Sequence, residues 1–120
     1  MKTYSFEKLG VWQDSRLLVK YVYFISKNFP DDERYGLTSQ LRRAMISVSC
    51  NIAEGTSRFS SKEKVRFIEI AFSSLMEVLN CLLLSNDMGY ITDDVLTQTR
   101  EDIDKIGNKL NALAKHFRSI

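Results

Sequence analysis

The side chains best suited to chemistry in this chain are basic, and several of them lie close together. Between Arg58 and Arg66 there are four bases and one acid, a local surplus that the formal net charge of +2 conceals. Lys and Arg bind phosphate oxygens, and such binding becomes strong through counterion release when several contacts form. The pattern favours contact with the backbone of RNA or DNA. The candidate nucleic-acid-binding residues are Arg42, Arg43, Arg58, Lys62, Lys64 and Arg66.

The same charges have a plainer explanation. Arg43 pairs with Glu54 or with a neighbouring subunit in this alternative, and the lysines are simply solvated, since exposed ion pairs commonly contribute little. The sequence leaves both explanations open.

A second set of polar residues recurs at helical spacing within the segment 35–58. Positions three or four apart fall along one side of an α-helix, and here they are Gln40, Arg43, Ser47, Asn51 and Glu54. Short hydroxyl and amide side chains prefer fixed hydrogen-bond partners, unlike the Lys and Glu of a solvated face. We therefore expect a polar network inside or beside an interface, where it fixes the register of the packed helices.

Catalytic and metal chemistry find little support. No paired carboxylates, nucleophile with a base, or phosphate-cradling loop accompanies the polar stripe, so we expect no catalytic residues and a non-enzymatic protein. His116 is the only histidine and has no Cys or second His nearby to share a metal. Cys50 and Cys81 are not at metal-ligand or redox spacing, and we expect both to be buried free thiols. The sequence thus predicts neither metal nor cofactor.

Four aromatic residues near the N-terminus are also candidates for binding. Trp12, Tyr21, Tyr23 and Phe24 could stack on bases. Aromatic residues at helical spacing more often belong to a core, which is the alternative here.

Length and composition predict one domain of an ordinary globular class. A chain of 120 residues can bury a single core without disulfides or metal. The N-terminus lacks the features of a signal peptide, and Glu77, Asn80 and Asn86 interrupt the most apolar region, 68–88, so no membrane span is expected. These features favour a cytoplasmic protein.

The apolar residues recur with a helical period in four segments, predicted at 11–28, 36–54, 61–88 and 92–118. Pro30 ends the first, Gly55 is a natural C-cap for the second, and Ser60 with Glu63 has capping-box spacing at the start of the third. The connections are short, so consecutive helices should pack antiparallel. The predicted fold is all-α, an up-down-up-down four-helix bundle of residues 1–120.

The third and fourth segments differ in how they use their apolar residues. The third is apolar around most of the cylinder, which is typical of a helix with neighbours on several sides. The fourth has an a/d seam that either fills its own bundle or binds a foreign helix. This seam consists of Leu96, Thr99, Ile103, Ile106, Leu110, Leu113 and Phe117.

Several short motifs together resemble a known family. They are LTSQLRRA at 37–44, NIAEG at 51–55 and MGY at 88–90, with Phe29-Pro30 and Tyr35-Gly36 at the first turn. In combination they are similar to the four-helix bundle proteins named for intervening sequences of bacterial large-subunit ribosomal RNA genes. The resemblance implies a four-helix bundle that assembles into a ring-like homopentamer. It also extends distantly to the accessory variability protein of diversity-generating retroelements, implicated in binding nucleic acid and a reverse transcriptase.

Two functional hypotheses follow. The first is a non-enzymatic homo-oligomer, with five subunits by the resemblance, whose basic patch binds RNA or DNA. The second is an oligomeric scaffold or adaptor for a protein partner, with no role for nucleic acid.

Overall fold

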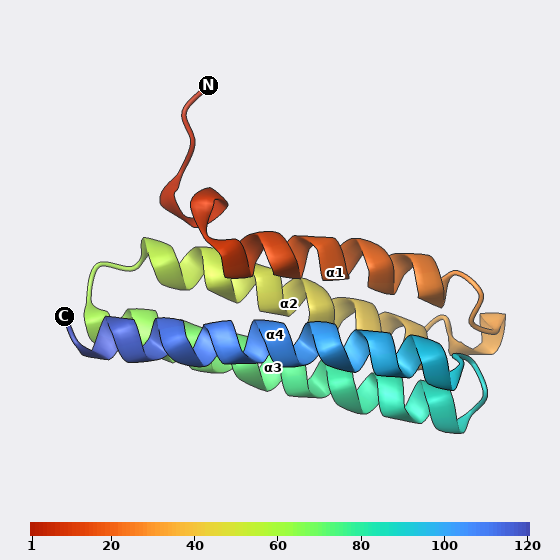
Figure 1. The fold of residues 1–120 in the computed structure, drawn as a ribbon. Coiled ribbons are helices and arrows are strands. Elements are labelled where there is room, and N and C mark those ends of the chain that lie inside the picture. Colours follow the sequence, from red (N-terminus) through yellow and green to blue (C-terminus); the bar gives the residue numbers. More distant parts are fainter.

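Four long α-helices account for most of the computed structural model, which describes residues 1–120 (Figure 1). They are α1 (Gly10–Ser26), α2 (Leu37–Ser57), α3 (Ser61–Asp87) and α4 (Asp93–Arg118), and two short 3-10 helices, η1 (Ser5–Lys8) and η2 (Asp31–Glu33), precede α1 and α2. Each helix runs back along the one before it (Figure 1). The all-α four-helix bundle expected from the sequence is confirmed.

The core forms where the apolar stripes of the four helices meet. Leu41, Val48 and Ile52 of α2 are fully buried, as are Leu75 and Leu82 of α3. The a/d seam of α4 fills its own bundle, because its central members are buried. Burial of this apolar surface contributes most of the folding free energy, since a buried Leu or Ile side chain adds about 1.5–3 kcal/mol.

Local signals set several of the helix ends. Ser60 caps α3, its Oγ accepting from the backbone N–H of Glu63 at 3.1 Å. Thr92 caps α4 in the same way, accepting from Val95 at 3.2 Å. Gly89 has a φ of +79°, the left-handed conformation that glycine adopts without strain, and it turns the chain after α3.

Gly55 does not cap α2, contrary to the sequence-based expectation. The helix continues to Ser57, and Gly55 is buried inside it. A Cβ at this position would lie 2.8 Å from Cβ of Phe67 on α3, so glycine is needed here for the close approach of the two helices. The first helix also ends at Ser26 rather than at the expected residue 28. The shift of two residues at the end of α1 is within the ordinary variation of helix ends.

Helix α3 is long and apolar enough, by length and composition alone, to be a candidate membrane span. In the bundle its buried residues face neighbouring helices, and its exposed side carries charged residues such as Glu69 and Glu77. The core helix of a bundle meets the same criteria of length and composition.

Candidate nucleic-acid interface

Three chain segments meet at one end of the bundle: the α2–α3 turn, the first turns of α3 and the last turn of α4 (Figure 1). Ser61 Oγ donates to the carbonyl oxygen of Ile120 at 3.3 Å, and Lys64 Nζ lies 5.3 Å from the centroid of the Phe117 ring. The bases of the final α4 turn therefore join those of the α2–α3 region. We call this set the basic end. It consists of Arg58, Lys62, Lys64, Arg66, Lys115 and Arg118.

Acidic residues neutralise only part of the basic end. Arg66 pairs with Glu63 at 3.9 Å and Arg118 with Glu69 at 3.8 Å, both in exposed positions where an ion pair contributes little. Arg58, Lys62 and Lys115 have no carboxylate within 4.0 Å. The basic end thus retains positive charge that is available to an anionic ligand.

An aromatic ring orients two of these arginines. The guanidinium carbons of Arg58 and Arg66 lie 4.4 and 5.8 Å from the centroid of the Phe67 ring. Cation–π contacts of this kind limit the freedom of the side chains while leaving their N–H groups free to donate. Ordered guanidinium groups lose less entropy when they bind a phosphate.

Lys64 has a structural task as well. Its Nζ donates to the backbone carbonyl of Thr56 at 2.8 Å, so it satisfies a carbonyl at the C-terminus of α2. This lysine is half-buried and is the least available member of the basic end.

Arg42 and Arg43 do not lie at the basic end. Arg42 faces α1, where its Nε donates to Ser26 Oγ at 2.8 Å and its guanidinium covers the Tyr23 ring at 4.5 Å. Arg43 is exposed on the outer side of α2. The Arg43–Glu54 pair considered from the sequence is absent, because eleven residues of helix separate the two side chains by about 16 Å.

The polar stripe of α2 lies along the seam with α3, but only its middle forms a network. The Ser47 and Ser74 hydroxyls are 2.9 Å apart, and Asn51 Nδ2 donates to Ser47 O at 2.8 Å and Ser47 Oγ at 3.0 Å. Gln40 and Glu54 are exposed, with no hydrogen bond from either side chain. The sequence interpretation missed Ser74, because only the packing of α3 against α2 identifies it.

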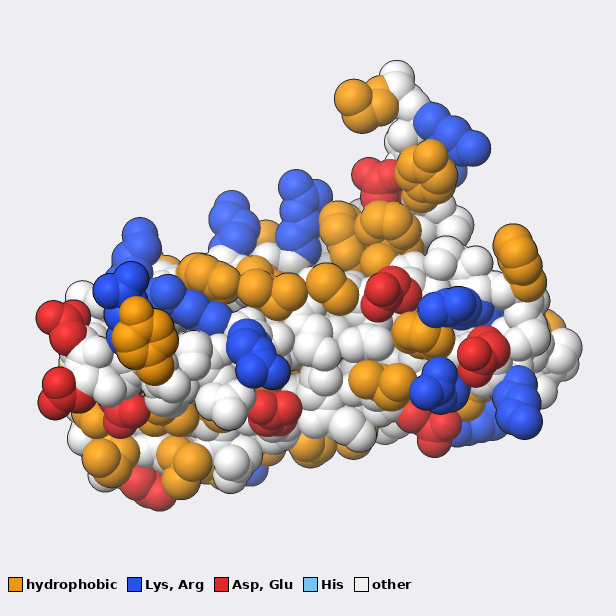
Figure 2. All heavy atoms as spheres, turned by 180° about the vertical axis from the view of Figure 1, so that it is seen from behind, with side chains coloured by type: hydrophobic (Ala, Val, Ile, Leu, Met, Phe, Trp, Pro, Cys, Tyr) orange, Lys and Arg blue, Asp and Glu red, His pale blue; other side chains and the backbone are white.

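The outer side of α2 and α3 carries exposed apolar residues beside this network. They are Ile46, Ile70, Met76 and Leu84. Figure 2 views the bundle from behind: backbone and uncharged polar atoms cover much of the middle of the molecule, with hydrophobic atoms above and below them. Single exposed apolar residues are common on protein surfaces, and these four carry no charge to attract phosphate.

Cys50 also lies on this outer side and is exposed, so the expectation that both thiols are buried is wrong for Cys50. It occupies the solvent-facing side of an amphipathic helix, where one small apolar residue is tolerated. Cys81 is buried as expected, and burial, with a smaller effect of Glu77, raises the pKa of its thiol.

The opposite end of the bundle is acidic. The α1–α2 and α3–α4 connections meet there, and Tyr90 Oη donates to Glu33 Oε2 at 2.9 Å across them. This hydrogen bond is the main cause of a raised pKa for Tyr90. The acids of the two connections, which we call the acidic end, are Asp31, Asp32, Glu33, Asp87, Asp93 and Asp94.

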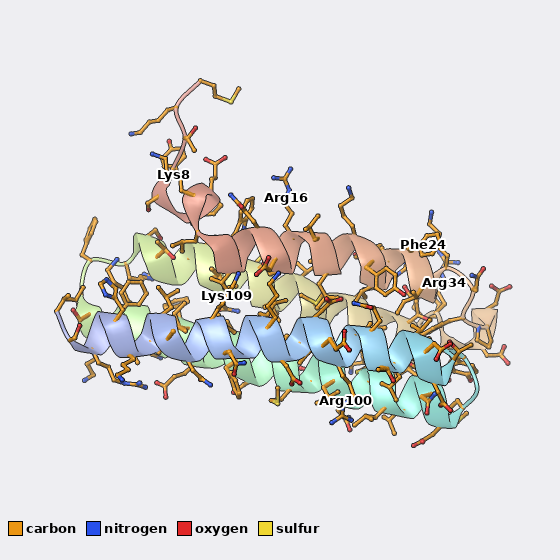
Figure 3. The ribbon with its side chains drawn as sticks, in the orientation of Figure 1. Lys8, Arg16, Phe24, Arg34, Arg100 and Lys109 are labelled. Carbon is orange, nitrogen blue, oxygen red and sulfur yellow. The ribbon has the colours of Figure 1, made fainter.

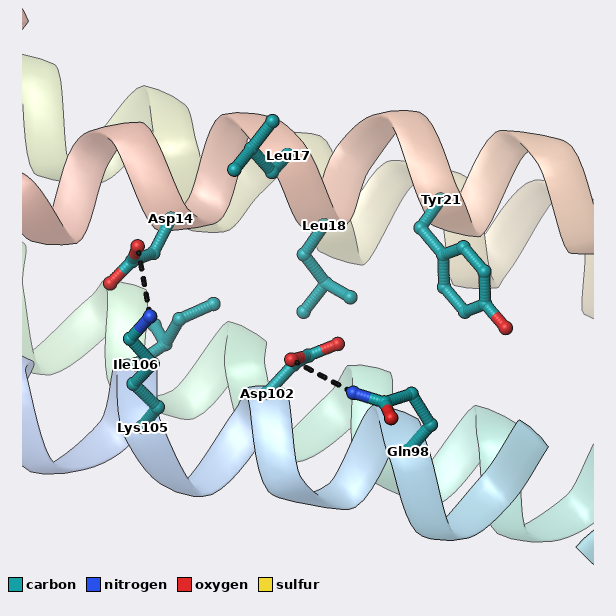
Figure 4. A pocket seen from close by; sticks show the side chains of 8 residues that line it. All are labelled: Asp14, Leu17, Leu18, Tyr21, Gln98, Asp102, Lys105 and Ile106. Atoms are coloured by element: carbon teal, nitrogen blue, oxygen red, sulfur yellow. Dashed lines mark hydrogen bonds and ion pairs between the residues drawn. The ribbon is translucent and has the colours of Figure 1, made fainter. Parts of the chain in front are cut away.

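A groove between α1 and α4 offers no reacting pair (Figure 4). Asp14 in its wall is engaged by Lys109 at 2.6 Å and Lys105 at 3.5 Å, and Asp102 accepts a long hydrogen bond from Gln98. No group of three or more His, Cys, Asp or Glu side chains is placed to hold a metal ion.

Comparison with known proteins gives a match by family and by fold. The family model described as 23S rRNA-intervening sequence protein matches residues 7–112. A similar solved structure is that of a protein of unknown function from the S23 ribosomal protein family of Bacteroides thetaiotaomicron. It has a TM-score of 0.80 at 21% identity, over 88% of this chain and 98% of that chain. The search of curated proteins finds no significant match.

Proposed function

This chain belongs to the 23S rRNA-intervening sequence protein family, and we propose that it is a non-enzymatic, homo-oligomeric bundle that binds RNA or DNA through its basic end. The observation that carries the proposal is the gathering of bases from the α2–α3 turn, α3 and α4 at one end of a nearly neutral molecule.

Charge separation along the bundle supports this function. Phosphate groups are attracted by the basic end and repelled by the acidic end, so an anionic polymer approaches in one orientation. The bases that lack a carboxylate partner supply the contacts, and the Phe67 ring holds Arg58 in place. Phosphate contacts alone carry no sequence information, so the proposed binding discriminates little between sequences.

Self-association through the outer side of α2 and α3 would strengthen this binding. Ile46, Ile70, Met76 and Leu84 expose apolar surface there. In a cyclic oligomer every subunit has the same environment, so a modest basic end is repeated around the ring and the phosphate contacts multiply.

Charge reversal at the basic end tests the nucleic-acid proposal. Arg58→Glu/Lys62→Glu changes two exposed side chains that have no ion-pair partner, so the fold should survive. We expect at least a tenfold loss of affinity for a structured RNA at low salt, since each lost phosphate contact removes counterion release. Fluorescence anisotropy with labelled RNA and with labelled duplex DNA measures the affinity of the wild type and of the variant.

Arg34→Glu/Arg100→Glu is the matched control, because it makes the same change in net charge away from the basic end. This variant should bind within about twofold of the wild type if the basic end is the site. Equal losses of RNA affinity in the two variants would mean that net charge alone causes the loss. That result would reject the basic end as the binding site.

The mass in solution and the reactivity of Cys50 test self-association together. An assembled protein should have a mass that is a multiple of 13.9 kDa. Cys50, on the outer side of α2, should then react slowly with an alkylating agent and faster on dilution. A monomeric mass at micromolar concentration would favour the scaffold alternative, in which a different protein covers the exposed apolar residues.

A further inference from the structure

The outer side of α1 carries a second set of bases that lies outside the basic end. Arg16, Lys20 and Lys27 follow one another at helical spacing along the crest of the helix and are exposed. Figure 3 shows Arg16 pointing away from the bundle. The crest from Arg16 to Lys27 is about 16 Å long, since each helical residue adds about 1.5 Å.

No acid neutralises this crest. None of its three bases has a carboxylate within 4.0 Å. The only acidic residue of α1 is Asp14, which is turned toward α4 and is already paired with Lys105 and Lys109. The crest is therefore a positive ridge even though the whole molecule is nearly neutral, and only its Lys27 end lies beside the α1–α2 connection that belongs to the acidic end.

Rings flank the ridge on both sides. Phe24 is 64% exposed and stacks on Tyr21 with ring centroids 6.4 Å apart. On the α2 side, Arg42 covers Tyr23, and the Arg16 guanidinium lies 5.3 Å from the Trp12 ring. Most of these rings are therefore engaged in packing, but Phe24 presents a ring to solvent beside the cations.

We propose that the α1 ridge, formed by Arg16, Lys20, Phe24 and Lys27, is a binding track for single-stranded nucleic acid. The bases contact successive phosphates, and the exposed Phe24 ring stacks on a base. Proteins that bind single strands without sequence preference combine a positively charged track with aromatic rings in this way. The track shares its class of ligand with the proposed function but uses only residues of α1 and its C-cap Lys27.

The shape of the ridge favours a single strand over an anionic membrane. Charged groups occupy the crest, whereas the exposed apolar residues Leu17 and Phe24 sit on the flank toward α4. A flat bilayer would meet the crest first and leave the flank out of reach, because interfacial helices bury a continuous apolar face. A flexible strand can follow the crest and turn a base onto the flank.

Trp12 is a built-in reporter for this site, because it is the only tryptophan and Arg16 lies over it. A single-stranded oligouridylate of about 16 nucleotides, the upper end of usual site sizes, should change its fluorescence. Lys20→Glu/Lys27→Glu should weaken binding at least tenfold and reduce the slope of log affinity against log salt by about 1.4, for two lost phosphates. Phe24→Ala should weaken binding about tenfold with an unchanged slope, since it removes stacking and no charge.

Control variants separate the two sites. Arg34→Glu/Arg100→Glu should leave the Trp12 response intact, and Arg58→Glu/Lys62→Glu should weaken overall binding while a Trp12 response remains. Circular dichroism verifies the fold of each variant. Trp12 fluorescence that does not change on addition of the oligonucleotide, or ridge variants that bind as tightly as the control, would contradict the ridge proposal. Neither result would bear on the basic end. A response to vesicles rich in phosphatidylserine but not to RNA would overturn it in favour of a membrane surface.

Discussion

Glu33 links three parts of the chain through one carboxylate. Its Oε1 accepts from the backbone N–H of Leu37 at 3.2 Å, at the start of α2, and its Oε2 accepts from Tyr90 Oη at 2.9 Å, after α3. A carboxylate at a helix N-terminus is favoured by the helix dipole. One acidic residue thus ties the α1–α2 and α3–α4 connections together.

Stability at high pH should depend on Tyr90. Folding raises the pKa of its phenol, mainly through the hydrogen bond to Glu33, so the folded protein holds this proton more tightly than the unfolded chain. The stabilisation is fully present below the ordinary pKa of 10.0 and is lost as the pH rises above it. The free energy of unfolding should therefore fall more steeply above pH 10 in the wild type than in Tyr90→Phe.

Urea unfolding of the two proteins at pH 8 and at a pH above 10 measures this difference. Tyr90→Phe should be the less stable protein at pH 8 because it lacks the hydrogen bond, and the gap should narrow at the higher pH. A gap that stays constant would show that the phenol proton is not linked to folding.

At the scale of the helices, the α2–α3 contact depends on Gly55. A Cβ there would meet Cβ of Phe67 at 2.8 Å, and this atom is fixed by the backbone of α3. Gly55→Ala gains up to about 1 kcal/mol of helix propensity. Overpacking costs about 1–3 kcal/mol, so we expect a net loss of stability, measured by thermal or urea unfolding.

Gly107 provides the matched control on α4. It is also a buried helical glycine, but the atom nearest its added Cβ would be a ring carbon of Phe72 at 3.4 Å, an ordinary contact with the far end of a side chain. Gly107→Ala should leave the stability unchanged or raise it. If both substitutions stabilised the protein, the close approach at Gly55 would not be a constraint.

The sequence predicted the helices well because their signals are local. The apolar period, Pro30 and the cap at Ser60 act within a few residues of the structure they determine. Gly55 was misassigned because a glycine near the end of an apolar period has two explanations, a cap or a close helix contact. Only the position of Phe67 on another helix distinguishes them.

The candidate site was less predictable, because tertiary contacts assemble it. Arg58, Lys62, Lys64 and Arg66 are neighbours in the sequence and remain so in space. Lys115 and Arg118 join them only because α4 ends beside the start of α3, as the Ser61–Ile120 hydrogen bond shows. Arg42 is not part of the basic end, because its position on α2 directs its side chain toward Tyr23 and Ser26 of α1.

At the scale of the whole molecule, the main feature is the separation of charge between the ends of a bundle 45 Å long. A net charge of +2 predicts a weak field, but the basic and acidic ends make the local potential strong and opposite in sign. In a ring whose subunits run parallel to the symmetry axis, all basic ends would lie on one face. The proposed assembly would therefore present one face that attracts nucleic acid and one that repels it.

The most direct test of the central claim, that the basic end binds phosphate, is the salt dependence of RNA affinity. Anisotropy titrations of the wild type and of Arg58→Glu/Lys62→Glu across a salt series give log affinity against log salt. We predict a straight line for the wild type and a slope shallower by about 1.4–1.8 for the variant, at about 0.7–0.9 for each phosphate lost. No binding at low salt, or identical slopes for the two proteins, would contradict the account.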